Sequence, residues 1–198
     1  FVPPTGGTDY FVDPARGGVK VRILTNSLAA TDVLPVHSGY ARHRERLLTA
    51  GVVLFERKPD ATQRPEDDAS RWKDGLRIPG GSGSAGSSGS SLHAKTFGVD
   101  KERLFVGSFN FDPRSARLNT ELGLIIDSPE LTQRLTDVFD QRVPQSSWEL
   151  RLDPQSGELR WFDAASTPPQ TLSVEPATTW WQRAAVFIFE RLPIEGML

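Results

Sequence analysis

The sequence contains no cysteine among its 198 residues. A disulfide, a thiolate zinc site and a cysteine nucleophile are therefore excluded. A continuous apolar run of about 18 residues is also missing, so no conventional membrane span is expected. Neither sign of charge is in large excess, because the formal net charge is only −2. The composition thus lacks the basic excess typical of nucleic-acid-binding proteins, and nucleic acid is not an expected partner.

What is present fits an ordinary globular domain. Hydrophobic residues make up 37% and charged residues 24% of the chain, proportions that are typical of soluble folded proteins. The length predicts a single domain over 1–198, long enough to bury a core. The chain opens on Phe1 without a signal-peptide pattern or an initiator Met, so we expect it to be a fragment of a longer protein.

The first part of the chain predicts a β–α–β unit. Residues 19–25 and 52–56 are apolar enough for strands, and a helix starting at Thr31 or Asp32 should run to Gly51. A helical crossover implies that the two strands are parallel. Asn26 follows the first strand at its carboxyl end, where α/β sheets tend to place ligand-binding residues.

A flexible loop is expected over 59–91. It ends in a Gly/Ser tract at 80–90, which is either a plain linker or a mobile loop beside a site, and we favour the linker. Further on, the pattern predicts a hairpin across 100–103 and a strand at 122–126.

The carboxyl-terminal part should begin with a helix that starts at Ser128-Pro129. A hairpin–helix extension is then expected over 146–198. Its final helix, at about 178–191, carries Trp180 and Trp181. The two tryptophans either lie in a lipid headgroup region or pack in the core.

One motif carries chemistry. It has the spacing H-x-K-x4-D-x6-G-S-x-N, with His93, Lys95, Asp100, Ser108 and Asn110 at its defined positions. In a strand, His93 and Lys95 point to the same side. An imidazole beside an ammonium suits a phosphate group, which Lys95 would neutralise while His93 attacks phosphorus or carries a proton. An isolated H-x-K pair is usually a surface feature, but the full spacing favours phosphodiester chemistry.

This spacing resembles the HKD motif of the phospholipase D superfamily. The resemblance implies an α/β fold, with a mixed β-sheet flanked by helices as an α-β-α sandwich, and one HKD half of a two-half fold. In that family two halves meet at one site, one histidine forms a phosphohistidine, and the other protonates the leaving alcohol. Neither a metal nor another cofactor is implied.

The resemblance also suggests individual roles. His93 looks like the carboxyl-terminal histidine, for which we favour the acid/base role over the nucleophile. Lys95 and Asn110 match phosphate-binding positions, and Ser108 supports their turn. Asp100 belongs to the signature, yet it falls on the strand face opposite His93, so we interpret it as a carboxylate that secures the turn.

Three further residues are candidates. Glu121 matches a family carboxylate that holds the Nδ1–H of the partner half's histidine, although it could be a surface acid at a strand start. Arg114 could bind phosphate, or it could pair with Asp112 and stiffen the loop. Asn26 should open toward the site. His37 and His43 are more simply explained as solvated or core histidines.

A narrower resemblance is to the carboxyl-terminal half of bacterial cardiolipin synthases of the C type. It covers roughly 19–58 and 91–198, with matches such as 25–32, 107–115 and 175–181. Two departures stand out. The first HKD half is absent, and 13–18 is too short for the helix that relatives carry before the first strand.

This resemblance implies phosphatidyl transfer between glycerophospholipids, giving cardiolipin. Phosphatidylglycerol is the expected substrate, with phosphatidylethanolamine as a second candidate. The partners would be a second HKD half or a homodimer, and a membrane surface, with a peripheral position at the bacterial inner membrane. Two alternatives remain: a homodimeric phospholipase D-family nuclease, and a half that is inactive without its partner.

Overall fold

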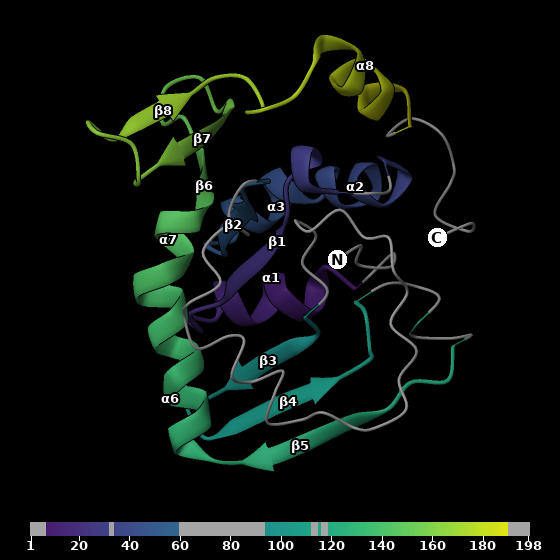
Figure 1. Cartoon of the computed structure of the whole chain (residues 1–198), viewed down its shortest axis with the longest axis vertical. Helices are drawn as coiled ribbons and strands as arrows, with labels where there is room; N and C mark the ends of the chain where they lie inside the picture. Colours follow the sequence, from purple (N-terminus) through teal and green to yellow (C-terminus); the bar gives the residue numbers. More distant parts are fainter. Residues whose placement is uncertain (1–6, 32–33, 60–93, 112–114, 116–118, 190–198) are drawn as a thin grey trace.

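The computed structural model describes residues 7–31, 34–59, 94–111, 115 and 119–189. These residues form two β-sheets with helices packed around them, as Figure 1 shows, and the α/β class is confirmed. The larger sheet has the strand order β1-β2-β6-β7-β8, and the smaller has the order β3-β4-β5. Within the described ranges, no helix is long enough and apolar enough to cross a bilayer.

The larger sheet is mixed. Its five strands are β1 (Arg22–Asn26), β2 (Val53–Arg57), β6 (Ser147–Leu152), β7 (Leu159–Asp163) and β8 (Gln170–Leu172). β1 and β2 are parallel, as the β–α–β pattern predicts, and every other pair is antiparallel. The hairpin expected in the carboxyl-terminal region is confirmed as β6–β7. Because β6 is the central strand, this hairpin is integral to the sheet.

The helices near the amino terminus differ from the sequence-based expectation. They are α1 (Asp9–Arg16), the short 3-10 helix η1 (Leu28–Ala30), α2 (Leu34–Ala41) and α3 (Arg44–Thr49). The prediction of one helix to Gly51 was wrong, because the His43 N–H bonds the Tyr40 carbonyl at 2.9 Å and this i→i+3 bond tightens the end of α2. The prediction that 13–18 is too short for a helix missed α1, which begins earlier, at Asp9.

The main core lies between α1, α3 and the larger sheet. It buries side chains from both helices and from three strands, which places one apolar face of each element against the others. Its buried members are Val12, Leu47, Ala50, Val52, Leu54, Trp148, Leu150 and Trp161.

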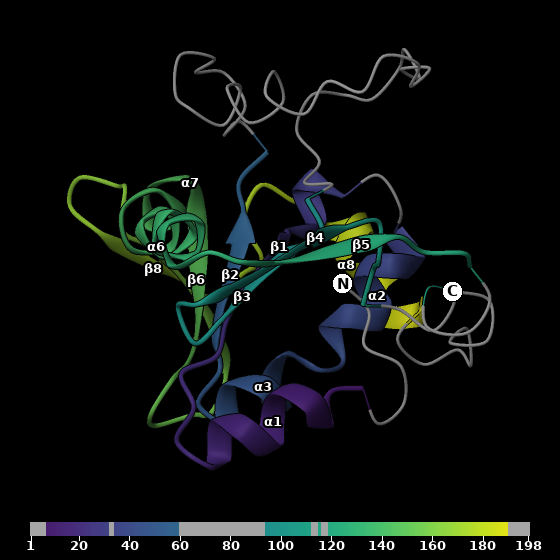
Figure 2. The same ribbon diagram turned by 90° about the horizontal axis from the view of Figure 1, so that it is seen from below.

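The smaller sheet is antiparallel and consists of β3 (Thr96–Val99), β4 (Arg103–Gly107) and β5 (Gly123–Asp127). The predicted hairpin after β3 is confirmed, and Asp100 and Lys101 make its turn with φ values of 54° and 59°. In the view from below in Figure 2 this sheet crosses in front of β1 and β2.

A helical column joins the two sheets, on the left of Figure 1. It consists of α6 (Pro129–Asp137), the π-helix η2 (Val138–Arg142) and α7 (Val143–Ser146). The helix start predicted at Ser128-Pro129 is confirmed, since the Ser128 hydroxyl accepts a hydrogen bond from the Leu131 N–H. α6 packs closely on β3, because a Cβ atom at Gly98 would lie 2.9 Å from the Thr132 methyl group.

The last helix, α8 (Trp180–Phe189), packs on α2 at the top of Figure 1. Val186 is its buried residue. Trp180 and Trp181 are exposed, so of the two sequence-based alternatives the core position for these tryptophans is wrong.

Candidate active site

The structure describes six of the eight candidate residues. His93 and Arg114 lie outside the described ranges, as does the Gly/Ser tract at 80–90. The other six lie just before β3, in the turn after it, in the segment after β4, two residues before β5 and at the end of β1; they are Asn26, Lys95, Asp100, Ser108, Asn110 and Glu121.

Backbone pairing brings Lys95 and Ser108 to the same end of the smaller sheet. The Gly107 N–H donates to the Lys95 carbonyl at 3.1 Å, which extends the β3–β4 ladder by one residue beyond β3. The Ser108 N–H then donates to the Leu122 carbonyl at 2.8 Å, and the Leu122 N–H donates to the Ser108 hydroxyl at 3.0 Å. The ends of three strands therefore meet where the motif requires them.

Two glycines make this junction possible. Gly107 and Gly123 face each other across β4 and β5, and the Phe105 ring occupies the space beside them. A Cβ atom at Gly123 would lie 2.2 Å from the ring, and one at Gly107 would lie 2.5 Å from the Leu122 carbonyl oxygen. A larger residue at Gly107 would push the Leu122 backbone away from Ser108, which gives a steric reason for glycine before serine in this motif.

Glu121 is the carboxylate at the centre of the junction. The Ser108 hydroxyl donates a hydrogen bond to it. Hydrogen bonds from Ser108, Ser115 and Asn119, together with the positive charge of Lys95, hold the pKa of Glu121 below its usual value. The structure therefore groups Lys95, Ser108 and Glu121, and it keeps the carboxylate ionised.

The remaining candidates occupy other positions in the chain. Asn110 is exposed, two residues beyond Ser108. Asp100 is in the turn at the opposite end of β3 from Lys95, about 17 Å along an extended strand. Asn26 ends β1 and belongs to the larger sheet. The described residues thus concentrate polar groups at one end of the β3-β4-β5 sheet and not around Asp100.

This group can bind an anion through Lys95 and accept a hydrogen bond through Glu121. Lys95 supplies a positive charge, whereas an ionised Glu121 would repel a phosphate placed directly on it. Glu121 is better suited to accept an N–H or O–H from a neighbouring group, such as an imidazole. Among the described residues there is no group of three or more His, Asp or Glu side chains placed to bind a metal ion.

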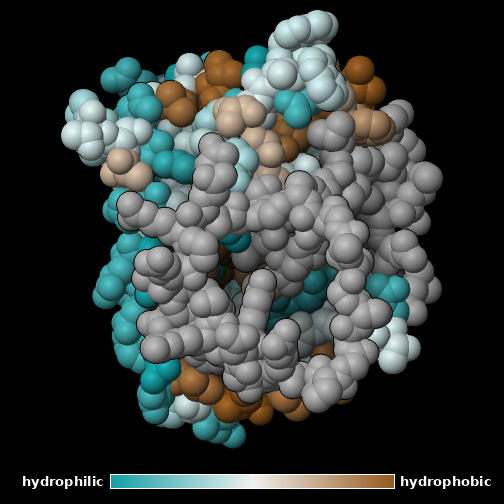
Figure 3. All heavy atoms as spheres, in the orientation of Figure 1, coloured by the Kyte–Doolittle hydropathy of each residue, from teal (hydrophilic) through white to brown (hydrophobic). Residues whose placement is uncertain are grey.

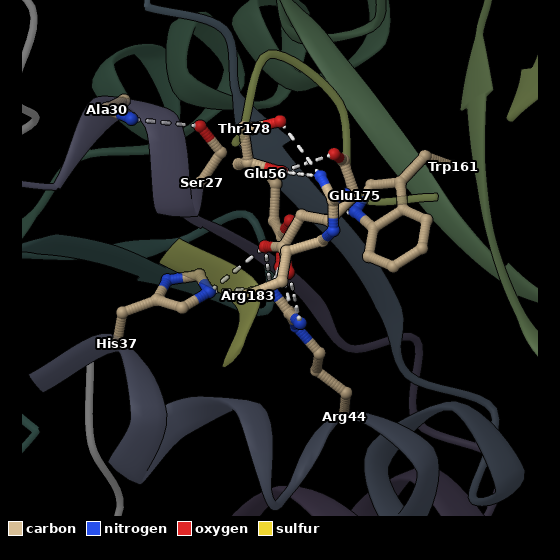
Figure 4. Close-up of polar contacts among 9 residues, drawn as sticks. All are labelled: Ser27, Ala30, His37, Arg44, Glu56, Trp161, Glu175, Thr178 and Arg183. Atoms are coloured by element: carbon tan, nitrogen blue, oxygen red, sulfur yellow. Dashed lines mark hydrogen bonds and ion pairs between the residues drawn. The ribbon is translucent and has the colours of Figure 1, made fainter. Parts of the chain in front are cut away.

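A second polar cluster is buried elsewhere, between α2, α3 and the larger sheet, as Figure 4 shows. Arg44 is its centre. Its guanidinium donates to Glu56 Oε1 at 2.8 Å through Nε and to Glu175 Oε1 at 2.7 Å through Nη2. The Trp161 indole donates to Glu56 Oε2 at 3.0 Å. His37 Nε2 lies 2.8 Å from Arg44 Nη2 and 3.1 Å from Glu175 Oε1.

The charged groups in this cluster shift one another's pKa values. Burial alone would raise the pKa of Glu175, but the hydrogen bond from His37 and the charge of Arg44 outweigh it and lower the pKa to about 2. Burial also opposes the charge of Arg44, yet the two carboxylates raise its pKa further above its usual value. A cavity of about 310 Å³ lies beside Arg44 and Glu175, with α8 forming part of its wall.

This cluster was not predicted from the sequence. Its members are separated by as many as 138 residues, so no local spacing joins them. One signal was available, namely Glu56 in the otherwise apolar strand 52–56, where a fully buried acid requires a partner. For His37 the sequence left solvated and core positions open, and the structure places it in the core.

A comparison with protein families matches residues 7–143 to the family described as "Cardiolipin synthase, PLD-like domain". The chain belongs to this family. The match includes β1 to β5 and thus the whole Lys95–Ser108–Glu121 junction.

Individual relatives agree with the family match. Cardiolipin synthase C of Escherichia coli is 45% identical over all 198 residues, which cover 39% of that protein. An uncharacterised protein of Helicobacter pylori is 32% identical over 76% of this chain and 26% of its own length. A cardiolipin synthase of Listeria monocytogenes is 42% identical over 28% of this chain. The chain therefore spans well under half the length of these relatives.

Proposed function

We propose that this chain forms one half of a phosphatidyltransferase that makes cardiolipin from glycerophospholipids. The observation that supports it best is the Lys95–Ser108–Glu121 junction, which lies within a family match to cardiolipin synthases. Phosphatidylglycerol is the proposed substrate, with phosphatidylethanolamine as a second candidate. The names of the relatives support this substrate class.

The proposed reaction has two displacements. A histidine of the second half attacks phosphorus, a P–N bond forms, and the P–O bond to the headgroup alcohol breaks while His93 gives its proton to the leaving oxygen. His93 then takes the proton of the acceptor hydroxyl, whose oxygen attacks phosphorus as the P–N bond breaks. Splitting the displacement in this way requires a nucleophile and a separate acid/base, and imidazole titrates in the range suited to both roles.

The other residues would neutralise the phosphate group and hold the opposing histidine in position. Lys95 and Asn110 would bind the non-bridging phosphate oxygens, and Arg114 is a further candidate for that role. The ionised Glu121, held by Ser108, would accept the Nδ1–H of the opposing histidine and fix its tautomer. Asp100 would serve the turn after β3, and Asn26 would border the site from β1.

The opposing histidine must come from a second HKD half or from a second copy of this chain. β5 supports such a partner, because Leu122, Leu124 and Ile125 are each more than half exposed immediately after Glu121. Apolar side chains in this density on an edge strand favour burial against another surface. The brown band at the lower edge of Figure 3 lies over this sheet. The proposed location is peripheral, at the bacterial inner membrane, where the substrate lipids reside.

The first experiment combines light scattering in mild detergent with a phosphatidylglycerol transfer assay on the same fractions. We expect activity in a dimer, or in a monomer supplied with a second HKD half. Removal of an acid/base group commonly costs 10²–10⁴-fold, so His93→Ala should reduce transfer by roughly that factor. Full activity of His93→Ala, or no transfer in any assembly containing both halves, would refute the proposal.

A matched pair of variants tests the carboxylate. Glu121→Gln should lower transfer at least roughly tenfold, because an amide does not stabilise an imidazolium. Glu130→Gln is the control, since Glu130 lies on the exposed surface of α6 with its side chain 75% exposed. Equal activity of the two variants would remove Glu121 from the proposed site.

A further inference from the structure

The exposed side of α8 is apolar, which is the reverse of an ordinary surface helix. With about 100° between successive residues, its exposed positions form one stripe roughly 120° wide. The stripe consists of Trp180, Trp181, Ala184, Phe187 and Ile188, and we call it the α8 stripe. The exposed fractions of its large side chains are 76% and 53% for the tryptophans and 56% and 59% for Phe187 and Ile188.

α8 packs on the rest of the chain mainly through its other side, and of the stripe residues Phe187 also lines the cavity beside Arg44. α8 contacts α2 through its other side, where Val186 is buried, and the Arg42 guanidinium donates to the Phe189 carbonyl at 2.9 Å. Figure 3 shows brown and tan spheres gathered at the upper right, where α8 lies in Figure 1. The helix is therefore held in place by one face, while Trp180, Trp181 and Ile188 are presented outward.

The charges near the stripe favour an anionic surface. Neither α2 nor α8 contains an Asp or Glu within its bounds. Arg183 lies on the flank of the stripe, with its guanidinium held by the Thr178 carbonyl at 2.8 Å, and Arg42 follows α2 directly. Tryptophans with arginine alongside are typical of helices that lie in the headgroup region of a bilayer.

We propose that the α8 stripe is the surface by which this chain docks on a bilayer of anionic phospholipid. Choosing lipid as the occupant rests on the proposed function, which requires a substrate that resides in such a bilayer. α8 spans only ten residues, or about 15 Å, so it lies along the surface and does not cross it. Burial of the stripe would add the apolar contact that the electrostatic attraction alone lacks.

The test is co-sedimentation of the full chain with vesicles of phosphatidylcholine, with and without phosphatidylglycerol. We expect binding that increases with phosphatidylglycerol. The double variant Trp180→Ser/Trp181→Ser should lower the partition coefficient at least roughly tenfold, since two large apolar side chains leave the contact. Tyr10→Ser is the matched control, because Tyr10 is an aromatic residue of α1 that is 81% exposed, and its binding should equal that of the unmodified chain.

Contact of the stripe tryptophans with the lipid is tested by quenching of tryptophan fluorescence, using vesicles with brominated acyl chains. On a Trp72→Phe background, quenching should fall in the double variant, because the remaining Trp148 and Trp161 are each only 6% exposed and lie in the core. Circular dichroism establishes that each variant is folded, and Phe187→Ser/Ile188→Ser provides a second lesion of the same stripe. Unchanged binding in both double variants, or no binding by the unmodified chain, would overturn the proposal.

A protein occupant gives a different result. If the stripe variants convert a dimer to a monomer in light scattering and leave vesicle binding intact, the stripe is a protein interface and the lipid proposal fails. Vesicle binding needs no turnover, so it separates the two proposals. A chain that docks through the stripe but never transfers lipid refutes only the proposed function, and an active chain that docks elsewhere refutes only this inference.

Discussion

Replacing Arg44 with Met should destabilise the fold more than any loss of a surface ion pair. The Arg44 side chain is only 6% exposed, and it is the shared cation for two carboxylates. Met is of similar length and carries no charge. In the Arg44→Met variant Glu56, which is fully buried, and Glu175, which is 9% exposed, would face each other without a guanidinium between them.

The expected magnitude follows from the burial. Removing one partner of a buried ion pair costs about 3–5 kcal/mol, because an uncompensated charge stays out of water. A domain of this kind has a free energy of unfolding of about 5–15 kcal/mol, so the variant loses a large part of it. With a urea m-value of about 2–3 kcal/mol per molar, the unfolding midpoint should fall by roughly 1–2 M.

The assay is urea unfolding followed by far-ultraviolet circular dichroism, with Arg134→Met as the control. Arg134 pairs with Glu130 on the exposed face of α6 at 2.8 Å, with side-chain exposures of 61% and 75%. Such i,i+4 pairs contribute about 0.3–0.5 kcal/mol, so this midpoint should hardly move. Equal midpoints for the two methionine variants would refute the view that the Arg44 cluster stabilises the fold.

A pH series identifies the cause of the loss. Without Arg44, burial favours the protonated form of Glu175, so the folded-state pKa of this carboxyl would rise above its unfolded-state value. The penalty is then largest near neutral pH and is relieved as the pH falls and Glu175 takes up a proton. A deficit that is the same at pH 7 and pH 5 would point to lost packing and not to uncompensated charge.

Three further predictions concern single contacts. Glu175→Gln should cost on the order of 3 kcal/mol at pH 7, because the folded-state pKa of Glu175 is about 2 against 4.5 for the free group. Its stabilisation is complete above about pH 4.5 and is lost as the pH falls toward 2, so urea midpoints of variant and unmodified chain should converge there; a constant gap would contradict this. Gly123→Ala should lower thermal stability by about 1–3 kcal/mol through its contact with Phe105, and Phe105→Leu should restore part of it, whereas an unchanged melting temperature would mean that the ring moves freely. Ser108→Ala should raise the pKa of Glu121 and move the acid limb of the transfer pH profile to higher pH; an unmoved limb would exclude a role for this hydrogen bond in transfer.

Features that depend on neighbours in the chain were predictable from the sequence. The hairpin turn at Asp100 and Lys101, the helix start at Ser128 and the β6–β7 hairpin all depend on a few adjacent residues. The parallel pairing of β1 and β2 also followed, because a helix between two strands leaves few alternatives. The offset between Lys95 and Ser108 was readable for the same reason, since a hairpin brings them to one end of the sheet.

Features that depend on distant contacts were not predictable from the sequence. The break between α2 and α3 accompanies a hydrogen bond between Thr8 and His43, 35 residues apart, and no helix-breaking residue marks it at positions 42–43. The Arg44–Glu175 ion pair joins segments 131 residues apart. The sequence left a headgroup position and a core position open for the tryptophans of α8, because the side that is buried is set by contact with α2.

The two polar clusters differ in burial, and this difference explains why the proposed active site requires a partner surface. The Arg44 cluster is buried, so its charges act at low dielectric and shift one another strongly. The Ser108–Glu121 pair is exposed, and water would weaken every electrostatic interaction that phosphoryl transfer requires. A surface that covers the exposed apolar residues of β5 would also exclude water from Glu121, which lies two residues before that strand. The same contact would therefore bury the apolar edge, lower the dielectric at the site and, on the proposed mechanism, deliver the second histidine.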